Sequence, residues 1–260
     1  MPFTFSHPAA IIDLPKKYFS LSALVIGSIL PDLEFFLCLE PVKNHLHSWP
    51  GMFWIGVPMG LFLYTFFHLF LKYPALSLFP KAHQEKLIPV CKRYKMNTAL
   101  DFFKIVISIV VGILSHIFVD SFTHEGNFMA THIPFLQNPI LTLPFATIRV
   151  ASFLQYFSTV VGIGYIILKY FIWFHYCTKI ERIESELLSF KKKLITILTI
   201  ITLAPLSAMT YGVVKSGLLY DHSRLYEFGG YTLLASISFT CIGFAIFALH
   251  LQFEGKMVKH

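Results

Sequence analysis

Six long apolar segments dominate this sequence and restrict the folds open to it. They are Tyr18–Leu39, Met52–Leu71, Phe102–Phe122, Ala151–Tyr176, Leu194–Val214 and Gly230–Leu251. Each has about 20 residues or more, the length at which a helix crosses the hydrocarbon core of a bilayer. Because backbone polar groups must be satisfied internally in lipid, we predict an all-α, polytopic membrane helix bundle with about six transmembrane helices.

The composition agrees with a membrane protein and argues against other classes. Hydrophobic residues make up 55% of the chain and charged residues only 13%, whereas a soluble domain has about 25% charged residues. The 4 cysteines stand singly, so their spacing supports neither a thiolate metal site nor a disulfide framework. The net charge of +7 follows the predicted topology, so we expect no nucleic-acid partner.

The basic residues orient the predicted spans. With the N-terminus inside, most of them flank the inner ends, and the outer connections keep only Lys43, Arg149, Lys215 and Arg224. Basic residues favour the cytoplasmic side, so we predict that both termini are cytoplasmic. The inner connection Glu181–Lys193 alternates acids and bases at helical spacing and predicts a helical extension. We treat 1–260 as one membrane domain, with a motif-bearing half at 1–150 and a helical scaffold half at 151–260.

The first span contains a helix breaker followed by two carboxylates. Pro31, Asp32 and Glu34 all lie within this apolar segment. Proline inside a helix removes a hydrogen bond and clashes with the preceding turn, so we predict a broken or re-entrant first segment. Asp32 and Glu34 would then line a cavity on irregular backbone. Alternatively, the helix ends here and both acids reach the outer headgroups.

The end of the third span carries His116, Asp120 and His124 at four-residue spacing. On a helix these side chains project from one face, about 6 Å apart. Gly112, one turn earlier, would let another helix approach closely. Ionisable groups inside a bilayer are costly unless they bind something or one another. The pattern therefore indicates either a binding site or a hydrogen-bond network between helices.

Other polar residues extend this set on the outer side. His45 and His47 occupy the short connection before the second span, whereas His68 lies near the inner end of that span and does not reach the site on the simple topology. Imidazole and carboxylate without thiolate suit zinc, manganese or iron. Glu34 is our candidate general base for a water molecule. The connection Glu125–Val150 is a candidate lid or re-entrant segment over the outer mouth.

Four motifs resemble those of one protein family. They are Pro2-Phe-Thr-Phe-Ser-His7-Pro-Ala-Ala10, Gly27-Ser-x-x-Pro31-Asp32-x-Glu34-x-Phe36, His47-Ser-x-x-Gly51 and Ser115-His116-x-x-x-Asp120-x-Phe122-Thr-His124-x-Gly126. In these motifs the chain resembles the bacterial membrane-protein family called domain of unknown function 4184. The likeness covers the N-terminal half in motif and most of the chain in hydropathy. It implies a place in the bacterial cytoplasmic (inner) membrane.

The motif order is also similar to that of LexA-regulated, membrane-bound, metal-dependent hydrolases and, more remotely, of zinc-dependent phospholipase C. The resemblance implies a divalent metal, zinc before manganese or iron, with the ligands His7, Asp32, His47, His116 and Asp120. We keep His45, His68 and His124 as possible additional ligands. The chain departs from the hydrolases, which commonly have His-Arg before Thr-His-Ser, in lacking both Arg and Thr before His47. The simple topology also puts His7 on the inner side, so either it is no ligand or Ser6–Lys17 is re-entrant.

Four functional classes use such residues. The leading hypothesis is an integral-membrane, metal-dependent hydrolase acting on a lipid-like or phosphoester substrate at the outer side of the membrane. A proton- or ion-coupled transporter or permease would use the same groups at a broken helix, although the missing internal repeat counts against it. A non-catalytic scaffold would use them to join helices. A bis-histidine haem protein is a weaker option, and the oligomeric state stays open.

Overall fold

A computed structural model of the chain describes residues 4–40, 45–92, 96, 98–143, 146–217 and 222–253. Six helical segments are long and apolar enough to cross a membrane: Leu21–Cys38, Trp49–Leu78, Ala99–His132, Val150–Tyr176, Phe190–Ser216 and Glu227–Phe253. The predicted all-α, multi-pass membrane bundle is therefore confirmed. Residues 2–3 of the first motif, Lys43 and the C-terminal residues 254–260 lie outside the described residues.

By its internal contacts the chain forms two compact units, each built from three stretches of sequence. The first unit contains Met1–Asp32, Asn44–Tyr64 and Met96–Tyr176. The second contains Leu33–Lys43, Thr65–Lys95 and Cys177–His260. The division of the chain into a motif-bearing half and a scaffold half stays a prediction.

The first unit carries most of the motif residues on helices and short turns. Its elements before α7 are η1 (Thr4–Ala10), α1 (Leu21–Ile29), η2 (Leu30–Asp32), α3 (Trp49–Gly51), η3 (Met52–Gly56) and most of α4 (Val57–Phe66). Its elements from α7 onward are α7 (Ala99–Thr123), α8 (Phe128–His132), α9 (Pro134–Gln137), β1 (Pro139–Leu143), β2 (Ala146–Arg149) and α10 (Val150–Tyr176). Thr98 and Asp101 form a capping box that starts α7, each side chain bonding the other's backbone N–H.

The first apolar segment is broken where Pro31 predicts a break. α1 ends at Ile29, a single 3-10 turn spans Leu30–Asp32, and α2 begins at Leu33. The turn puts Asp32 on backbone that is not α-helical, with 1% of its surface exposed. The prediction of a broken first segment is therefore confirmed.

Gly27 and Gly112 allow the backbones of α1 and α7 to touch where the two helices cross. A Cβ on Gly112 would lie 2.5 Å from the Leu24 carbonyl oxygen and 2.7 Å from the Ser28 amide nitrogen. A Cβ on Gly27 would likewise meet the backbone of Ile109 on α7. Small residues at a membrane helix crossing permit such an approach. The close crossing fixes α7 against the segment that leads to Asp32.

The N-terminal segment doubles back among the helices of the first unit. η1 packs against α1, α7 and α10, and Ser6 lies beside Gly162 in the middle of α10. Farther along, the backbone carbonyls of Lys16 and Lys17 accept hydrogen bonds from Lys104 Nζ, near the start of α7. The re-entrant reading of Ser6–Lys17 therefore fits the structure, and the simple placement of His7 across the membrane from His116 is wrong.

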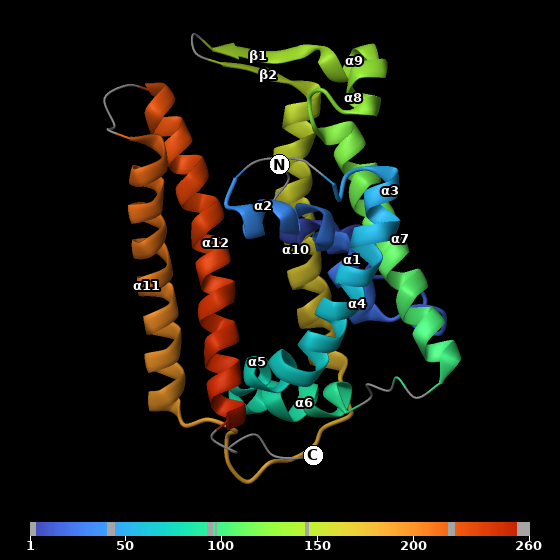
Figure 1. Cartoon of the computed structure of the whole chain (residues 1–260). Helices are drawn as coiled ribbons and strands as arrows, with labels where there is room; N and C mark the ends of the chain where they lie inside the picture. The colour runs from blue at the N-terminus through green and yellow to red at the C-terminus, as the bar shows by residue number, and fades with distance from the viewer. Residues whose placement is uncertain are drawn as a thin grey trace. The chain divides into compact units, whose positions relative to one another are not determined.

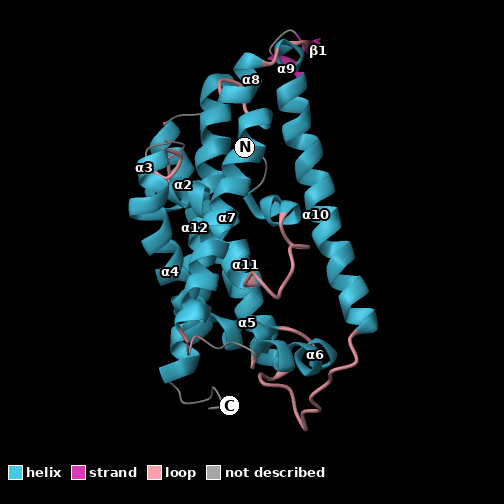
Figure 2. Ribbon diagram, turned by 90° about the vertical axis from the view of Figure 1, so that its right-hand side faces the viewer, coloured by secondary structure: helices cyan, strands magenta, loops and turns pink. Residues whose placement is uncertain are grey.

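The connection Glu125–Val150 folds into short elements. Figures 1 and 2 show α8, α9 and a hairpin of β1 and β2 at one end of α7 and α10. The strands pair antiparallel, with Thr142 opposite Thr147. A small apolar cluster anchors this region on the two long helices through Ala130, Leu136, Val150 and Ala151, with Phe122, Ile133 and Leu154 packed against them. Its role as a lid stays a prediction.

The second unit is built around two long helices. α11 (Phe190–Ser216) and α12 (His222–Phe253) run side by side (Figure 1). The unit also contains α2 (Leu33–Cys38), η4 (Phe67–Leu71), α5 (Lys72–Leu78) and α6 (Lys81–Cys91).

The predicted helical extension at Glu181–Lys193 is wrong. This stretch is irregular up to Ser189, and α11 begins only at Phe190. Its backbone N–H groups bond α6 instead: Glu181 N donates to the Glu85 carbonyl at 2.9 Å, and Leu187 N donates to Gln84 Oε1 at 3.1 Å.

Candidate metal centre

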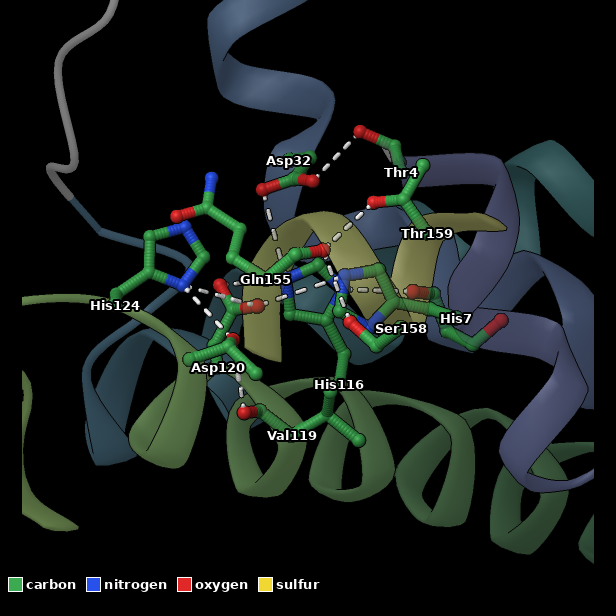
Figure 3. Close-up of polar contacts among 12 residues, drawn as sticks. Thr4, His7, Asp32, His116, Val119, Asp120, His124, Gln155, Ser158 and Thr159 are labelled. Carbon is green, nitrogen blue, oxygen red and sulfur yellow. Dashed lines mark hydrogen bonds and ion pairs between the residues drawn. The ribbon is translucent and has the colours of Figure 1, made fainter. Parts of the chain in front are cut away.

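Asp32 reaches the interior of the first unit from the 3-10 turn that follows α1. One carboxylate oxygen, Oδ2, accepts a hydrogen bond of 2.7 Å from Thr4 Oγ1 on η1. The other oxygen, Oδ1, lies 3.5 Å from His116 Nε2 (Figure 3). Thr4 thus holds the carboxylate in one orientation and leaves Oδ1 directed at the imidazole.

His116 is oriented by the backbone of α1. Its Nδ1 lies 2.8 Å from the Ser28 carbonyl oxygen. A carbonyl only accepts, so Nδ1 carries the proton that it donates, and the neutral ring keeps a lone pair on Nε2. Histidines that bind metals typically donate their other ring N–H to a backbone carbonyl or a carboxylate in this way. The helix crossing therefore also sets which nitrogen of His116 faces the cluster.

Four side chains bring one donor atom each to a common point. The donor atoms of Asp32, His47, His116 and Asp120 all lie within 4.8 Å of one another. His116 Nε2 is 3.5 Å from Asp32 Oδ1 and 3.4 Å from Asp120 Oδ2, and His47 Nε2 is 3.9 Å from Asp32 Oδ1. Two ligands held tetrahedrally at 2.0–2.1 Å stand about 3.4 Å apart. This spacing suits ligands of one ion, and the cluster could hold a metal ion.

The turn that carries His47 is fixed by its own motif. Ser48 Oγ donates to the His45 carbonyl at 2.8 Å and accepts from Gly51 N at 3.1 Å, which caps α3. A Cβ on Gly51 would collide with that same carbonyl. The His-Ser-x-x-Gly pattern is therefore explained by backbone packing, and it holds His47 in place. His45 itself is exposed and is not one of the four donors.

His7 and His124 approach the cluster through Asp120. The ring of His7 stacks on His116 with centroids 3.9 Å apart, and its Nε2 lies 3.5 Å from Asp120 Oδ1. His124 Nδ1 lies 3.4 Å from the same oxygen. His7 is 3% exposed, and burial favours the neutral imidazole, which is the form that binds a metal.

The turn after α7 explains how His124 stays near Asp120. His124 is already extended, because α7 ends at Thr123. Gly126 then adopts φ 91°, which favours glycine. The chain turns back so that Asn127 Nδ2 donates to the Asp120 carbonyl at 3.0 Å. The prediction that three polar residues share one helical face thus holds for His116 and Asp120, and a turn supplies His124.

The centre concentrates ionisable groups where water is excluded. His7, Asp32, His116 and Asp120 each expose 3% of their surface or less. Within the described part of the chain, both ring nitrogens of His7, Asp32 Oδ1, His116 Nε2 and Asp120 Oδ1 have no hydrogen-bond partner. Buried polar atoms without partners are costly. Such a group of inward-facing donors is expected where an ion completes the site.

Besides His45, two predicted residues are not among these donors. Glu34 and His68 belong to the second unit, so their roles stay predictions. Two supporting residues, Thr4 and Ser28, were not predicted as part of the site. Both stand in the quoted motifs, three residues before His7 and four before Asp32, and this spacing is the signal that could have found them.

The comparisons with known proteins identify a family. A family model described as Domain of unknown function (DUF4184) matches residues 1–251. The chain belongs to this family. No curated protein and no solved structure matches the chain. The likeness to metal-dependent hydrolases therefore rests on the motifs alone, and the function is argued from the centre.

Proposed function

We propose that this member of the family is a metal-dependent hydrolase of the bacterial cytoplasmic (inner) membrane, acting on a lipid-like or phosphoester substrate. Zinc is the first choice of metal, with manganese or iron next. The observation that carries the proposal is the set of four imidazole and carboxylate donors within 4.8 Å of one another. A divalent ion bound there would polarise a carbonyl or phosphoryl oxygen and activate a water molecule.

The residues of the chain prepare the centre before any ion binds. Ser28 fixes the tautomer of His116, and Thr4 fixes the carboxylate of Asp32. Ligands whose orientation is set in advance need little reorganisation on binding, which favours tight and selective coordination. The burial of His116 and Asp120 keeps bulk water out, so charges in the centre interact strongly.

The proposed sidedness follows from the basic residues. Lys104 lies near the start of α7 and binds the carbonyls of Lys16 and Lys17, whereas His116 and Asp120 lie toward its other end. Basic residues favour the cytoplasmic side. We therefore propose that the centre opens toward the outer leaflet and that both termini are cytoplasmic.

Glu34 remains our candidate general base, because it follows Asp32 by two positions in the motif. It would accept a proton from water, a role suited to a carboxylate. The matched substitution is Glu34→Gln, which keeps the shape and removes the charge. We expect it to abolish hydrolysis and to leave the metal content of the protein unchanged.

The decisive experiment measures metal content in detergent-purified protein. Wild type, His116→Ala and Asp120→Ala are compared by inductively coupled plasma mass spectrometry, with His132→Ala as control because His132 is exposed on α8. We expect zinc, manganese or iron in the wild type and the control, and loss of metal in the other two variants. Lipid and phosphoester substrates are then screened with the loaded protein.

A metal-free wild type under every loading condition would overturn the hydrolase proposal. The contacts of His116 with Asp32 and Asp120 would then form an ion-pair network between α1 and α7. On that reading His116→Ala lowers the melting temperature without changing the metal content. A proton-coupled transporter would instead show pH-dependent flux in proteoliposomes, which His116→Ala abolishes.

A further inference from the structure

A small cavity lies where α8 and α9 pack against the start of α10. Its volume is about 100 Å³ and it is partly open, which leaves room for several water molecules or one small polar group. Figures 1 and 2 show these elements at one end of α7 and α10. Glu125 and Arg149 line the cavity together with the polar side chains of Thr131 and Gln137. Among the described residues, its lining shares none with the four-donor cluster.

Glu125 and Arg149 place opposite charges at this cavity. Arg149 Nε lies 3.8 Å from Glu125 Oε2, and each side chain is 45% exposed. This distance is long for a charge-assisted hydrogen bond, which is about 2.7–2.9 Å, and exposed ion pairs contribute little to stability. Ser152 Oγ donates to the other oxygen, Glu125 Oε1. Within the described part of the chain the guanidinium has no other polar partner, so its N–H groups remain available to a ligand.

The cavity lies at the level of the lipid headgroups. α7 has 25 residues and α10 has 27, so the two helices are about 37–40 Å long at a rise of about 1.5 Å per residue. The hydrocarbon core is about 30 Å thick, so the ends of both helices reach the headgroup layer. Phe128, Phe135 and Ile140 are exposed on α8, α9 and β1. Apolar side chains in this position insert at the boundary between headgroups and acyl chains, so the region contacts lipid.

We propose that this cavity binds a phospholipid headgroup that carries both a phosphate and a primary ammonium group. The planar guanidinium of Arg149 matches two oxygens of the phosphate, and the Glu125 carboxylate accepts hydrogen bonds from the ammonium group. A purely anionic headgroup places its phosphate beside Glu125 and leaves that carboxylate without a cation. A quaternary ammonium group is recognised by aromatic rings, and none of the described residues that line the cavity is aromatic. The inference goes beyond the proposed function, because it needs neither the metal nor hydrolysis.

Lipid titration tests the inference without any assay of activity. Full-length protein in detergent is titrated with phosphatidylethanolamine or with phosphatidylglycerol of the same acyl chains, and bound lipid is measured by native mass spectrometry. The variants are Arg149→Gln and Glu125→Gln. Lys215→Gln is the control, because it removes another exposed ion pair, with Glu40, in the second unit. Arg149→Lys keeps the charge and loses the planar fork, and it replaces Arg149→Gln should that variant fail to fold.

We expect the wild type and Lys215→Gln to bind phosphatidylethanolamine about tenfold more tightly than phosphatidylglycerol, because one charged hydrogen bond distinguishes the two lipids. Arg149→Gln should weaken the binding of both lipids by about tenfold. Glu125→Gln should weaken the binding of phosphatidylethanolamine alone and so remove the preference. A purely structural role of Glu125 would instead weaken the binding of both lipids in that variant.

Equal binding of the two lipids by the wild type would overturn the inference. An unchanged affinity in Arg149→Gln, or an equal loss of both lipids in Glu125→Gln, would also overturn it. Phosphoethanolamine without acyl chains is the third probe, and binding as tight as that of the lipid would show that the site takes a free small molecule. The metal content should stay the same in every variant, so the outcome leaves the proposed function to its own test.

Discussion

Two helix pairs in this protein, α1 with α7 and α11 with α12, both place a glycine at their contact, but the atoms that the glycine faces differ. In the first unit α1 and α7 meet backbone to backbone at Gly27 and Gly112, and buried ionisable groups follow directly. In the second unit α11 and α12 pack together, with Ala204, Ala208 and Ala235 buried and Gly212 beside the side chains of Thr232 and Phe228.

The difference shows what a polar membrane interior requires. Hydrogen bonds and ligand geometry depend on tenths of an ångström, so the first pair is fixed by backbone contact, which cannot adjust. In the second pair the contact at Gly212 is made with side chains, and a rotating side chain can absorb small changes. Replacing one glycine at each crossing by alanine tests whether the backbone contact is less tolerant than the side-chain contact.

The largest effect is expected for Gly112→Ala. The new methyl group would collide with the backbone of α1 at Leu24 and Ser28, and neither atom can move without shifting the helix. We expect the free energy of unfolding to fall by about 3 kcal/mol and bound metal to be lost. Chemical denaturation in detergent and metal analysis measure both. Gly164→Ala is the control, because nothing lies within 4 Å of a Cβ there.

A smaller effect is expected for Gly212→Ala in the second unit. Here a Cβ would meet side-chain atoms of Thr232 and Phe228, which can rotate away. We expect a loss of about 1 kcal/mol and no change in metal content, measured by the same two methods. A loss as large as that of Gly112→Ala would contradict the contrast between rigid and adjustable contacts.

Removing one hydroxyl from each unit sharpens the comparison further. Thr4→Val deletes the donor to Asp32, and Ser238→Ala deletes a bond of 2.7 Å to the Phe36 carbonyl. Each should cost about 1 kcal/mol of stability. Only Thr4→Val should weaken metal binding, by about 10- to 100-fold, because it removes the hydrogen bond that orients a ligand. Competition with a metal chelator gives the two affinities, and equal affinities would show that Thr4 does not orient the carboxylate.

The smallest effect is expected where the re-entrant segment meets α10. A hydrogen bond from Lys169 at 2.7 Å, together with one from Tyr165, lowers the pKa of the exposed Asp13 carboxyl. A depressed carboxyl pKa stabilises the fold above its unfolded value of about 3.9, and that stability is lost as the pH falls through the folded pKa. Asp13→Asn should therefore lower the melting temperature slightly at pH 7. The difference from the wild type should shrink as the pH falls below about 3.9, because the carboxyl group then becomes protonated. A difference that persists at the lower pH would show that charge is not its source.

Some features of the fold and of the site follow from local chemistry alone. The length of each apolar segment determines the spans, because about 20 residues cross the bilayer whatever their neighbours are. Pro31 breaks the first segment because its ring and missing N–H act on the adjacent turn. His116 and Asp120 share a face because one helical turn separates them. These features were predictable from the sequence.

Other features depend on contacts between distant parts of the chain. His7 was misplaced by the simple topology because counts of basic residues orient whole spans and carry no information on a segment that doubles back. The stretch Glu181–Lys193 shows helical charge spacing, yet α6 accepts hydrogen bonds from the backbone N–H groups of Glu181 and Leu187. These hydrogen bonds to a distant helix outweigh the weak helix propensity of the stretch.

The sequence by itself thus determined the spans, the break at Pro31 and the residue types of the candidate centre. Only the tertiary structure decided which donors meet. His116 and Ser28 are 88 positions apart, and their contact exists because Gly27 and Gly112 let two helices cross at backbone distance. Hydropathy does not specify the angle and depth of a helix crossing, since side-chain shape at the contact sets both.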